Sequence, residues 1–81
     1  MGEVNMKDVI INVLQEGLKH DDLRVEGSDA KYEVDIISDE FKGKTIIQRH
    51  KIIYALLDAY IKTGEIHALT IKAHTVSESK K

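Results

Sequence analysis

The chain has 81 residues and a formal net charge of −2, with 42% hydrophobic and 32% charged residues. This length allows one domain with one small hydrophobic core, because a chain of this size buries only about 60% of its unfolded surface. The absence of cysteine excludes disulfide bonds and any iron–sulfur site built from the chain's own thiolates. The charge balance disfavours a strongly basic nucleic-acid-binding protein and a polybasic membrane anchor.

The sequence contains no signal for a membrane protein or for an enzyme. No apolar run approaches the ~20 residues that a membrane-spanning helix needs, and the N-terminal stretch MGEVNMKD lacks the apolar segment of a secretory signal. We therefore expect a cytoplasmic protein that makes no membrane contact. No nucleophile is paired in sequence with a recognisable base, so we expect no enzymatic activity.

The first half of the chain predicts a helix followed by a β-hairpin. The helix covers about residues 5–19, with Asn5 as its expected N-cap. Its apolar face consists of residues at helical spacing: Met6, Val9, Ile10, Val13, Leu14 and Gly17. Residues 23–26 and 31–36 alternate apolar and polar side chains, which is typical of strands, and Gly27-Ser28-Asp29 is the expected turn between them.

The second half predicts a long helix and a last strand. Residues 38–43 form a connection with at most one helical turn, a helix covers 44–63 with Gly64 as its stop, and a strand covers 66–73. One face of the helix is predicted to meet the sheet: Ile46, Ile47, His50, Ile53, Tyr54, Leu57 and Ile61. We accordingly predict that His50 is mostly buried, with a ring nitrogen hydrogen-bonded inside the fold. The domain is expected to cover residues 1–76, and residues 77–81 a frayed polar tail.

These elements predict a single α+β domain of order α-β-β-α-β. The short turn favours an antiparallel first pair of strands, whereas the long helix between the second and third strands favours a parallel pair with a right-handed crossover. The result is a three-stranded mixed sheet with both helices on one face. This order is like that of KH class II RNA-binding folds, but the Gly-x-x-Gly loop of that module is absent.

Several short motifs occur in a family-like order: Phe41-x-Gly43, Arg49-His50, Tyr54 and His67-Ala68-Leu69. In spacing and order they resemble the signature of the BolA-like family, and the C-terminal motif is closest to its bacterial-type branch. The resemblance extends from the first helix to Thr75. It implies the family's α-β-β-α-β fold, which agrees with the order predicted from the residues.

The resemblance implies an adaptor that pairs with a monothiol glutaredoxin. Such a pair shares or transfers a [2Fe-2S] cluster in iron–sulfur assembly and iron homeostasis, with one side held by the glutaredoxin cysteine and by glutathione. The resemblance assigns the partner contacts to four residues: Arg49, His67, Ala68 and Leu69. It implies that the chain binds no cofactor when isolated, and we expect a monomer or a weak homodimer.

By the same resemblance His67 is a cluster ligand, and a second ligand comes from the loop before the second strand. The family loop usually offers His or Cys there, whereas this chain offers Ser28, Asp29 and Lys31. A protonated lysine has no lone pair for iron, and oxygen is a poor match for an iron–sulfur centre. The identity of the second ligand therefore stays open.

Two alternatives follow from the same residues. From spacing alone, His67 begins the inward-facing side of the last strand and also fits a structural histidine in the core or at its rim. The family includes DNA-binding regulators of stress response and cell morphology, and such a role would use five basic residues: Lys42, Lys44, Arg49, Lys51 and Lys62. With a net charge of −2, DNA binding is expected to be weak and strongly salt-dependent.

Overall fold

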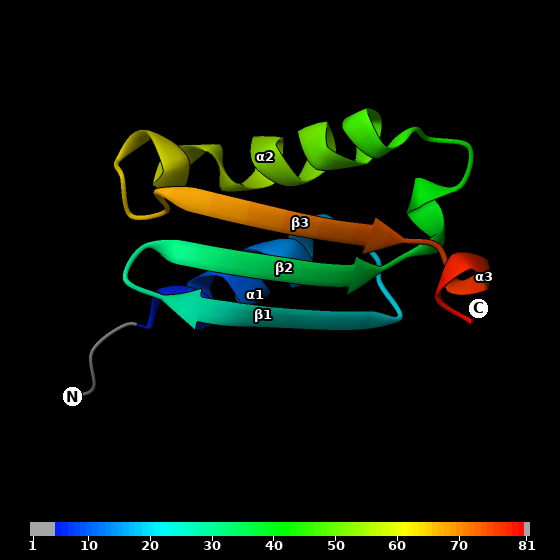
Figure 1. The fold of residues 1–81 in the computed structure, drawn as a ribbon, viewed down its shortest axis with the longest axis horizontal. Coiled ribbons are helices and arrows are strands. Elements are labelled where there is room, and N and C mark those ends of the chain that lie inside the picture. The colour runs from blue at the N-terminus through cyan, green and yellow to red at the C-terminus, as the bar shows by residue number, and fades with distance from the viewer. Residues whose placement is uncertain (1–4, 81) are drawn as a thin grey trace.

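The computed structural model describes residues 5–80 and confirms the predicted order of elements (Figure 1). Residues 1–4 of the predicted domain and residue 81 of the predicted tail lie outside the described residues. The elements in chain order are α1 (Met6–Gly17), β1 (Asp22–Ser28), β2 (Lys31–Ile37), the single 3-10 turn η1 (Asp39–Phe41), α2 (Ile46–Lys62), β3 (Ala68–His74) and α3 (Val76–Ser79). The connection after β2 thus contains the one helical turn that was expected.

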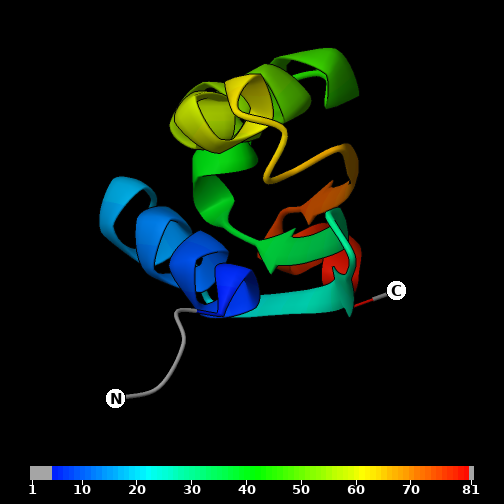
Figure 2. The ribbon, with the colours of Figure 1, turned by 90° about the vertical axis from the view of Figure 1, so that its left-hand side faces the viewer.

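The sheet has the order β1-β2-β3, with β1 and β2 antiparallel and β2 and β3 parallel, as predicted. Val25 of β1 pairs with Val34 of β2, which pairs with Ile71 of β3, so an apolar row crosses the sheet on one face. α1 and α2 both lie on this face (Figure 2). The resulting α+β domain has its core between the two helices and the sheet.

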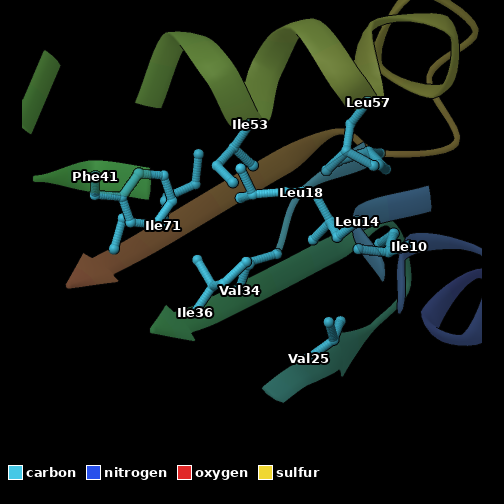
Figure 3. Close-up of a cluster of buried hydrophobic side chains, with 12 residues drawn as sticks. Ile10, Leu14, Leu18, Val25, Val34, Ile36, Phe41, Ile53, Leu57 and Ile71 are labelled. Carbon is cyan, nitrogen blue, oxygen red and sulfur yellow. The ribbon is translucent and has the colours of Figure 1, made fainter. Parts of the chain in front are cut away.

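The core consists of twelve buried apolar side chains, most of which are seen in Figure 3. They come from every major element: Ile10, Leu14, Leu18, Val25, Val34, Ile36, Phe41, Ile53, Leu57, Ile66, Ile71 and Ala73. The other sheet face is polar and carries the Lys72–Glu33 ion pair at 3.5 Å. One face of the sheet is therefore covered and the other is open, as is typical of small sheets with antiparallel pairs.

The helix starts follow from capping chemistry. The Asn5 side chain accepts the Lys7 N–H at 2.9 Å, as expected of the N-cap of α1. α2 begins two residues later than predicted, because the Thr45 hydroxyl accepts the Gln48 N–H and the Gln48 side chain accepts the Thr45 N–H in a capping box. The chain leaves α2 through Gly64, which has a φ of 84° as the expected stop.

The buried face of α2 is rotated relative to the predicted one. Ile53 and Leu57 are buried as expected, but Ile46 and Ile47 are 67% and 68% exposed and Tyr54 is 41% exposed. The place of an apolar residue on that face is taken by Arg49, which is only 7% exposed. The helical wheel failed here because it places charged side chains outside and cannot foresee that the fold supplies polar partners for Arg49.

The β1–β2 turn (residues 28–31) also differs from the prediction. Gly27 and Ser28 belong to β1, and the two central turn residues are Asp29 and Ala30, with φ of 53° and 66°. Positive φ at both central positions is what a type I′ hairpin turn requires, and this type matches the twist of the strands. Glycine is the usual residue at such a position, so Ala30 holds an unfavourable conformation.

The predicted frayed tail is wrong for the residues up to Ser79. Val76–Ser79 form α3, and Thr75 and Glu78 form a second capping box. Glu78 also forms an ion pair with Arg49 of α2 at 2.7 Å. The end of the described chain is therefore attached to the core of the domain.

We predict that Ala30→Gly raises the free energy of unfolding by about 1 kcal/mol, because glycine adopts positive φ without steric cost. The measurement is urea unfolding with an unchanged m-value. The matched control is Ala59→Gly, at an exposed position inside α2, which should lower the stability by a similar ~1 kcal/mol. A loss of stability on Ala30→Gly as large as that of the control would contradict the strain assigned to the turn.

Candidate functional site

His67 is exposed and immediately precedes β3, so it is not the buried histidine that its strand parity also allowed. Its backbone N–H donates to the Ala30 carbonyl at 2.7 Å, and the Ala68 N–H donates to the same oxygen at 3.1 Å. Ala30 lies in the β1–β2 turn. The turn and His67 therefore lie side by side at one end of the sheet, the end where β3 begins (Figure 1).

The entry to β3 explains why the His67 backbone is well fixed. Ile66 is 2% exposed, and its N–H donates to the Tyr60 carbonyl at 3.0 Å, which attaches the chain to the end of α2. Two residues later Ala68 pairs with Lys31 at the start of the parallel ladder. His67 is held between these two attachments. Its ring forms no hydrogen bond within residues 5–80, so both ring nitrogens stay open to an external group.

The β1–β2 turn brings three more predicted site residues to this end of the sheet. Ser28, Asp29 and Lys31 are all exposed, and they offer a hydroxyl, a carboxylate and an ammonium group beside the His67 segment. The turn contains no second imidazole and no thiol. Within the described part of the chain, no three His, Cys, Asp or Glu side chains gather closely enough to hold a metal ion. This end therefore offers one nitrogen ligand and additional oxygen atoms.

The other predicted partner residues differ in accessibility. Ala68 is exposed and follows His67 directly, whereas Leu69 is half-buried and packs against the core. Arg49 is buried and lies on α2, away from the start of β3. His67 and Ala68 are thus open to solvent, and Arg49 is not.

Arg49 is instead a structural centre at the other end of β3. Its Nε donates to the Lys44 carbonyl and its Nη1 to the Ala73 carbonyl, both at 3.0 Å. Nη1 and Nη2 donate to the two carboxylate oxygens of Glu78 at 2.7 and 3.1 Å. The guanidinium carbon lies 5.9 Å from the centre of the Phe41 ring. Four of the five N–H donors of Arg49 are used inside the fold, and the residue is only 7% exposed. Its contact with a partner or with nucleic acid stays a prediction, which this burial disfavours.

The Arg49–Glu78 pair shifts the pKa of both residues. Hydrogen bonds from Arg49 lower the pKa of Glu78 from 4.5 to about 2, and the bond from the Thr75 N–H acts in the same direction. The hydrogen bond to Glu78 raises the pKa of Arg49 above its ordinary value. A bidentate pair of this kind is geometrically specific as well as charged. It holds α3 against the loop before α2 and the end of β3.

The lysines assigned to nucleic acid do not form one surface. Lys42, Lys44 and Lys51 are exposed around the start of α2, while Lys62 lies at the other end of this 17-residue helix, about 25 Å away. Lys62 is also paired with Asp58 at 3.0 Å, on the exposed side of the helix. Three lysines near the start of α2 remain as a small basic patch without Arg49, and one of them, Lys42, is paired with Asp39 at 3.8 Å.

His50 is partly buried, in agreement with the prediction, but its ring forms no hydrogen bond within the described residues, so the predicted hydrogen bond inside the fold is not found. The ring lines a groove of ≈ 570 Å³, which we call the α2–β3 groove. Its main lining residues come from the first turns of α2 and the last residues of β3: Lys44, Ile46, His50, Ile71, Lys72 and His74. No signal in the sequence pointed to this groove.

The model of the BolA-like protein family matches residues 3–78. This chain belongs to the BolA-like family. An uncharacterized protein of Haemophilus influenzae is 38% identical over 72 residues, covering 89% of this chain and 85% of that protein. The DNA-binding transcriptional regulator BolA of Escherichia coli is 31% identical over 70 residues, covering 86% of this chain and 64% of that protein.

The fold of this BolA-like chain is similar to solved structures of the same family. BolA1 from Arabidopsis thaliana has a TM-score of 0.85 and 30% sequence identity, covering 94% of this chain and 98% of that chain. Within residues 5–80, no helix has the length and apolar character that crossing a bilayer requires.

The Arg49–Glu78 pair predicts a specific pH dependence of stability. The folded-state pKa of Glu78 is depressed, so its stabilising effect is complete above pH 4.5 and is lost as the pH falls toward 2. Glu78→Gln should therefore unfold at a lower temperature than wild type at neutral pH, and the difference should shrink between about pH 5 and pH 2. Thermal unfolding followed by circular dichroism across this range measures the difference.

The control for this prediction is Glu16→Gln, at an exposed position of α1 without an ion pair to any described residue. It should follow the wild-type curve at every pH. If Glu78→Gln unfolded at the same temperature as wild type at every pH, the pair would not stabilise the fold.

Proposed function

We propose that this BolA-like chain is an adaptor that pairs with a monothiol glutaredoxin and provides His67 as a ligand to a shared [2Fe-2S] cluster. The observation that carries the proposal is the placement of His67. Its side chain is exposed, while its backbone is fixed by the bonds at Ala30 and by the burial of Ile66. A ligand held in this way loses little conformational freedom on binding.

The residues present fit one half of a cluster site. Iron–sulfur clusters are held mainly by thiolates, and imidazole replaces thiolate in some centres and raises the reduction potential. The chain has no cysteine, so thiolates must come from the glutaredoxin and from glutathione. What this chain contributes is the imidazole of His67 and a contact surface that includes Ala68.

The second ligand position does not have an ideal donor in this chain. Lys31 starts β2 beside Ala68, but an ammonium group offers no lone pair. Asp29 and Ser28 offer oxygen, which suits iron–sulfur centres less well than nitrogen or sulfur. We propose that the chain holds the cluster through one nitrogen, a mode that favours release of the cluster over storage.

The proposal also includes the cellular compartment in which the chain acts. Free glutathione and a reactive glutaredoxin cysteine persist as thiols in reducing compartments. A cytoplasmic location therefore suits the proposed pair. The role is one of binding and transfer, with no catalytic step assigned to any residue of this chain.

The test is reconstitution of the pair from the chain, a monothiol glutaredoxin, glutathione, iron and sulfide. The expected product is a heterodimer with visible absorption, and His67→Ala should lower cluster retention by about tenfold or more, since even residues that only support a ligand contribute that much. The matched control is His74→Ala. His74 is also exposed but ends β3, about 20 Å along the strand from His67.

Two outcomes would count against the proposal. If His67→Ala retained the cluster as wild type does, His67 would not be a ligand. If His67→Ala and His74→Ala lost it equally, the effect would be a general loss of stability. Thermal unfolding of both variants in the absence of partner separates these cases.

A second function, DNA binding, is favoured by one comparison and one structural observation. The Escherichia coli relative is named a DNA-binding transcriptional regulator. In this chain Lys42, Lys44 and Lys51 gather at the start of α2. Three lysines allow only a few phosphate contacts, which gives weak, sequence-independent binding.

If the chain binds duplex DNA through this patch, the double variant Lys44→Gln/Lys51→Gln should lower the slope of log affinity against log salt by about 2, one for each phosphate contact removed. Fluorescence anisotropy from about 50 mM salt upward measures this slope. The control is Arg24→Gln, which removes an exposed charge from β1. Equal slopes for the double variant and the control would exclude this patch as the DNA site.

A further inference from the structure

The α2–β3 groove lies at the end of β3 opposite to His67, and the cluster-binding function proposed above does not use it. β3 is an edge strand, because it pairs with β2 alone in the sheet order β1-β2-β3. An edge strand presents backbone N–H and C=O groups that can pair with another chain. The question is whether these groups are accessible along the groove.

The hydrogen bonds show which backbone groups face the free edge. The Ser38 N–H donates to the His74 carbonyl at 2.8 Å, so the backbone groups of His74 face β2. Backbone direction alternates along a strand, and the Ala73 carbonyl accordingly faces the other way, where it accepts Arg49. By the same alternation the N–H and C=O of Ile71 face the free edge. They form no bond across that edge within residues 5–80.

The groove also contains apolar surface that is open to a ligand. Ile46 is 67% exposed on the α2 side, whereas Ile71 and Ala73, which line the groove on the β3 side, are buried at 8% exposure each. A large exposed isoleucine beside a free strand edge is costly to leave in water. Ile46 can contact an apolar side chain on the facing side of an added strand.

The charges around the groove favour an acidic ligand. Lys44, Lys72, His50 and His74 line it, and Glu78 is its single acidic lining residue. The carboxylate of Glu78 already accepts hydrogen bonds from both Nη atoms of Arg49. The Lys72–Glu33 pair is half-exposed at 3.5 Å, and pairs of this kind contribute little.

We propose that the α2–β3 groove binds an extended acidic peptide segment of another protein, which adds to the free edge of β3 as a fourth strand. Strand addition obtains affinity from main-chain hydrogen bonds and specificity from alternate side chains. The apolar residues of the added strand would lie against Ile46, and its carboxylates would lie near Lys44 beside the start of α2 and near Lys72 on the open face of the sheet. Single-stranded nucleic acid suits the groove less well, since no phenylalanine, tyrosine or tryptophan lines it for base stacking.

The experiment uses the full chain and a fluorescent peptide, acetyl-(Val-Glu)4-amide, as the probe. Fluorescence anisotropy should show saturable binding, and backbone amide shifts should change at Ile71, Lys72 and Ala73. The same peptide with N-methyl groups on alternate residues cannot pair along the edge and should not bind. A Val-Lys peptide of equal length should bind at least fivefold more weakly, because its charges oppose those of the rim.

Lys44→Glu should weaken binding of the Val-Glu peptide about fivefold or more, as expected when an attraction becomes a repulsion. The matched control is Lys51→Glu, on the same helix and exposed but outside the groove, which should change affinity less than twofold. Unchanged amide shifts at Ile71–Ala73 at millimolar peptide would overturn the proposal. So would equal binding of the N-methylated peptide, or a duplex DNA of matched charge that shifts the same residues at lower concentration.

Discussion

The carbonyl oxygen of Ala30 accepts the backbone N–H groups of both His67 and Ala68, and the geometry of the candidate site depends on this double acceptor. It joins the β1–β2 turn to His67 and Ala68, which lie 37 and 38 positions later in the sequence. The parallel register of β2 and β3 continues from this point, with Lys31 beside Ala68. The turn pays a conformational cost at Ala30, and the two hydrogen bonds offset it.

A second fixed point lies at the opposite end of β3. Arg49 connects the loop before α2, the end of β3 and α3, and its charge is matched by Glu78. With one end of β3 held at Ala30 and the other at Arg49, the strand is positioned along its whole length. Its two ends then carry different surfaces, an exposed imidazole at His67 and the α2–β3 groove.

Much of the fold was predictable because it rests on periodicity and turn chemistry. Alternation in residues 23–26 and 31–36 predicted the hairpin, and the apolar spacing of the first helix predicted the face that it buries. Those patterns reflect apolar burial, which dominates the energetics of a small domain. The parallel pairing of the last strand followed from the length of the helix before it.

The errors concern polar groups whose partners are distant in the sequence. Burial of Arg49 depends on Ala73 and Glu78, 24 and 29 residues away, and no local pattern reports such contacts.

The C-terminal helix α3, in contrast, did leave a local signal in the sequence. Thr75-Val-Ser-Glu78 is a capping-box sequence, which predicts a helix start where we expected a frayed tail.

The placement of His67 was predictable only in part. Its exposure follows from the burial of Ile66, and its closeness to the β1–β2 turn follows from the parallel register. The prediction that His67 is a ligand came from the resemblance to the BolA-like family. The match over residues 3–78 confirms the family, and the ligand role stays a proposal. Its role as a cluster ligand is the central claim, and spectroscopy can test it directly.

That measurement is pulsed electron paramagnetic resonance of the reduced cluster in the glutaredoxin pair, with 15N in the four histidines of this chain alone. The account predicts one 15N nucleus coupled to the cluster, which disappears in His67→Ala and persists in His74→Ala. No coupling from this chain, or coupling from two of its histidines, would contradict a cluster held here through the single nitrogen of His67.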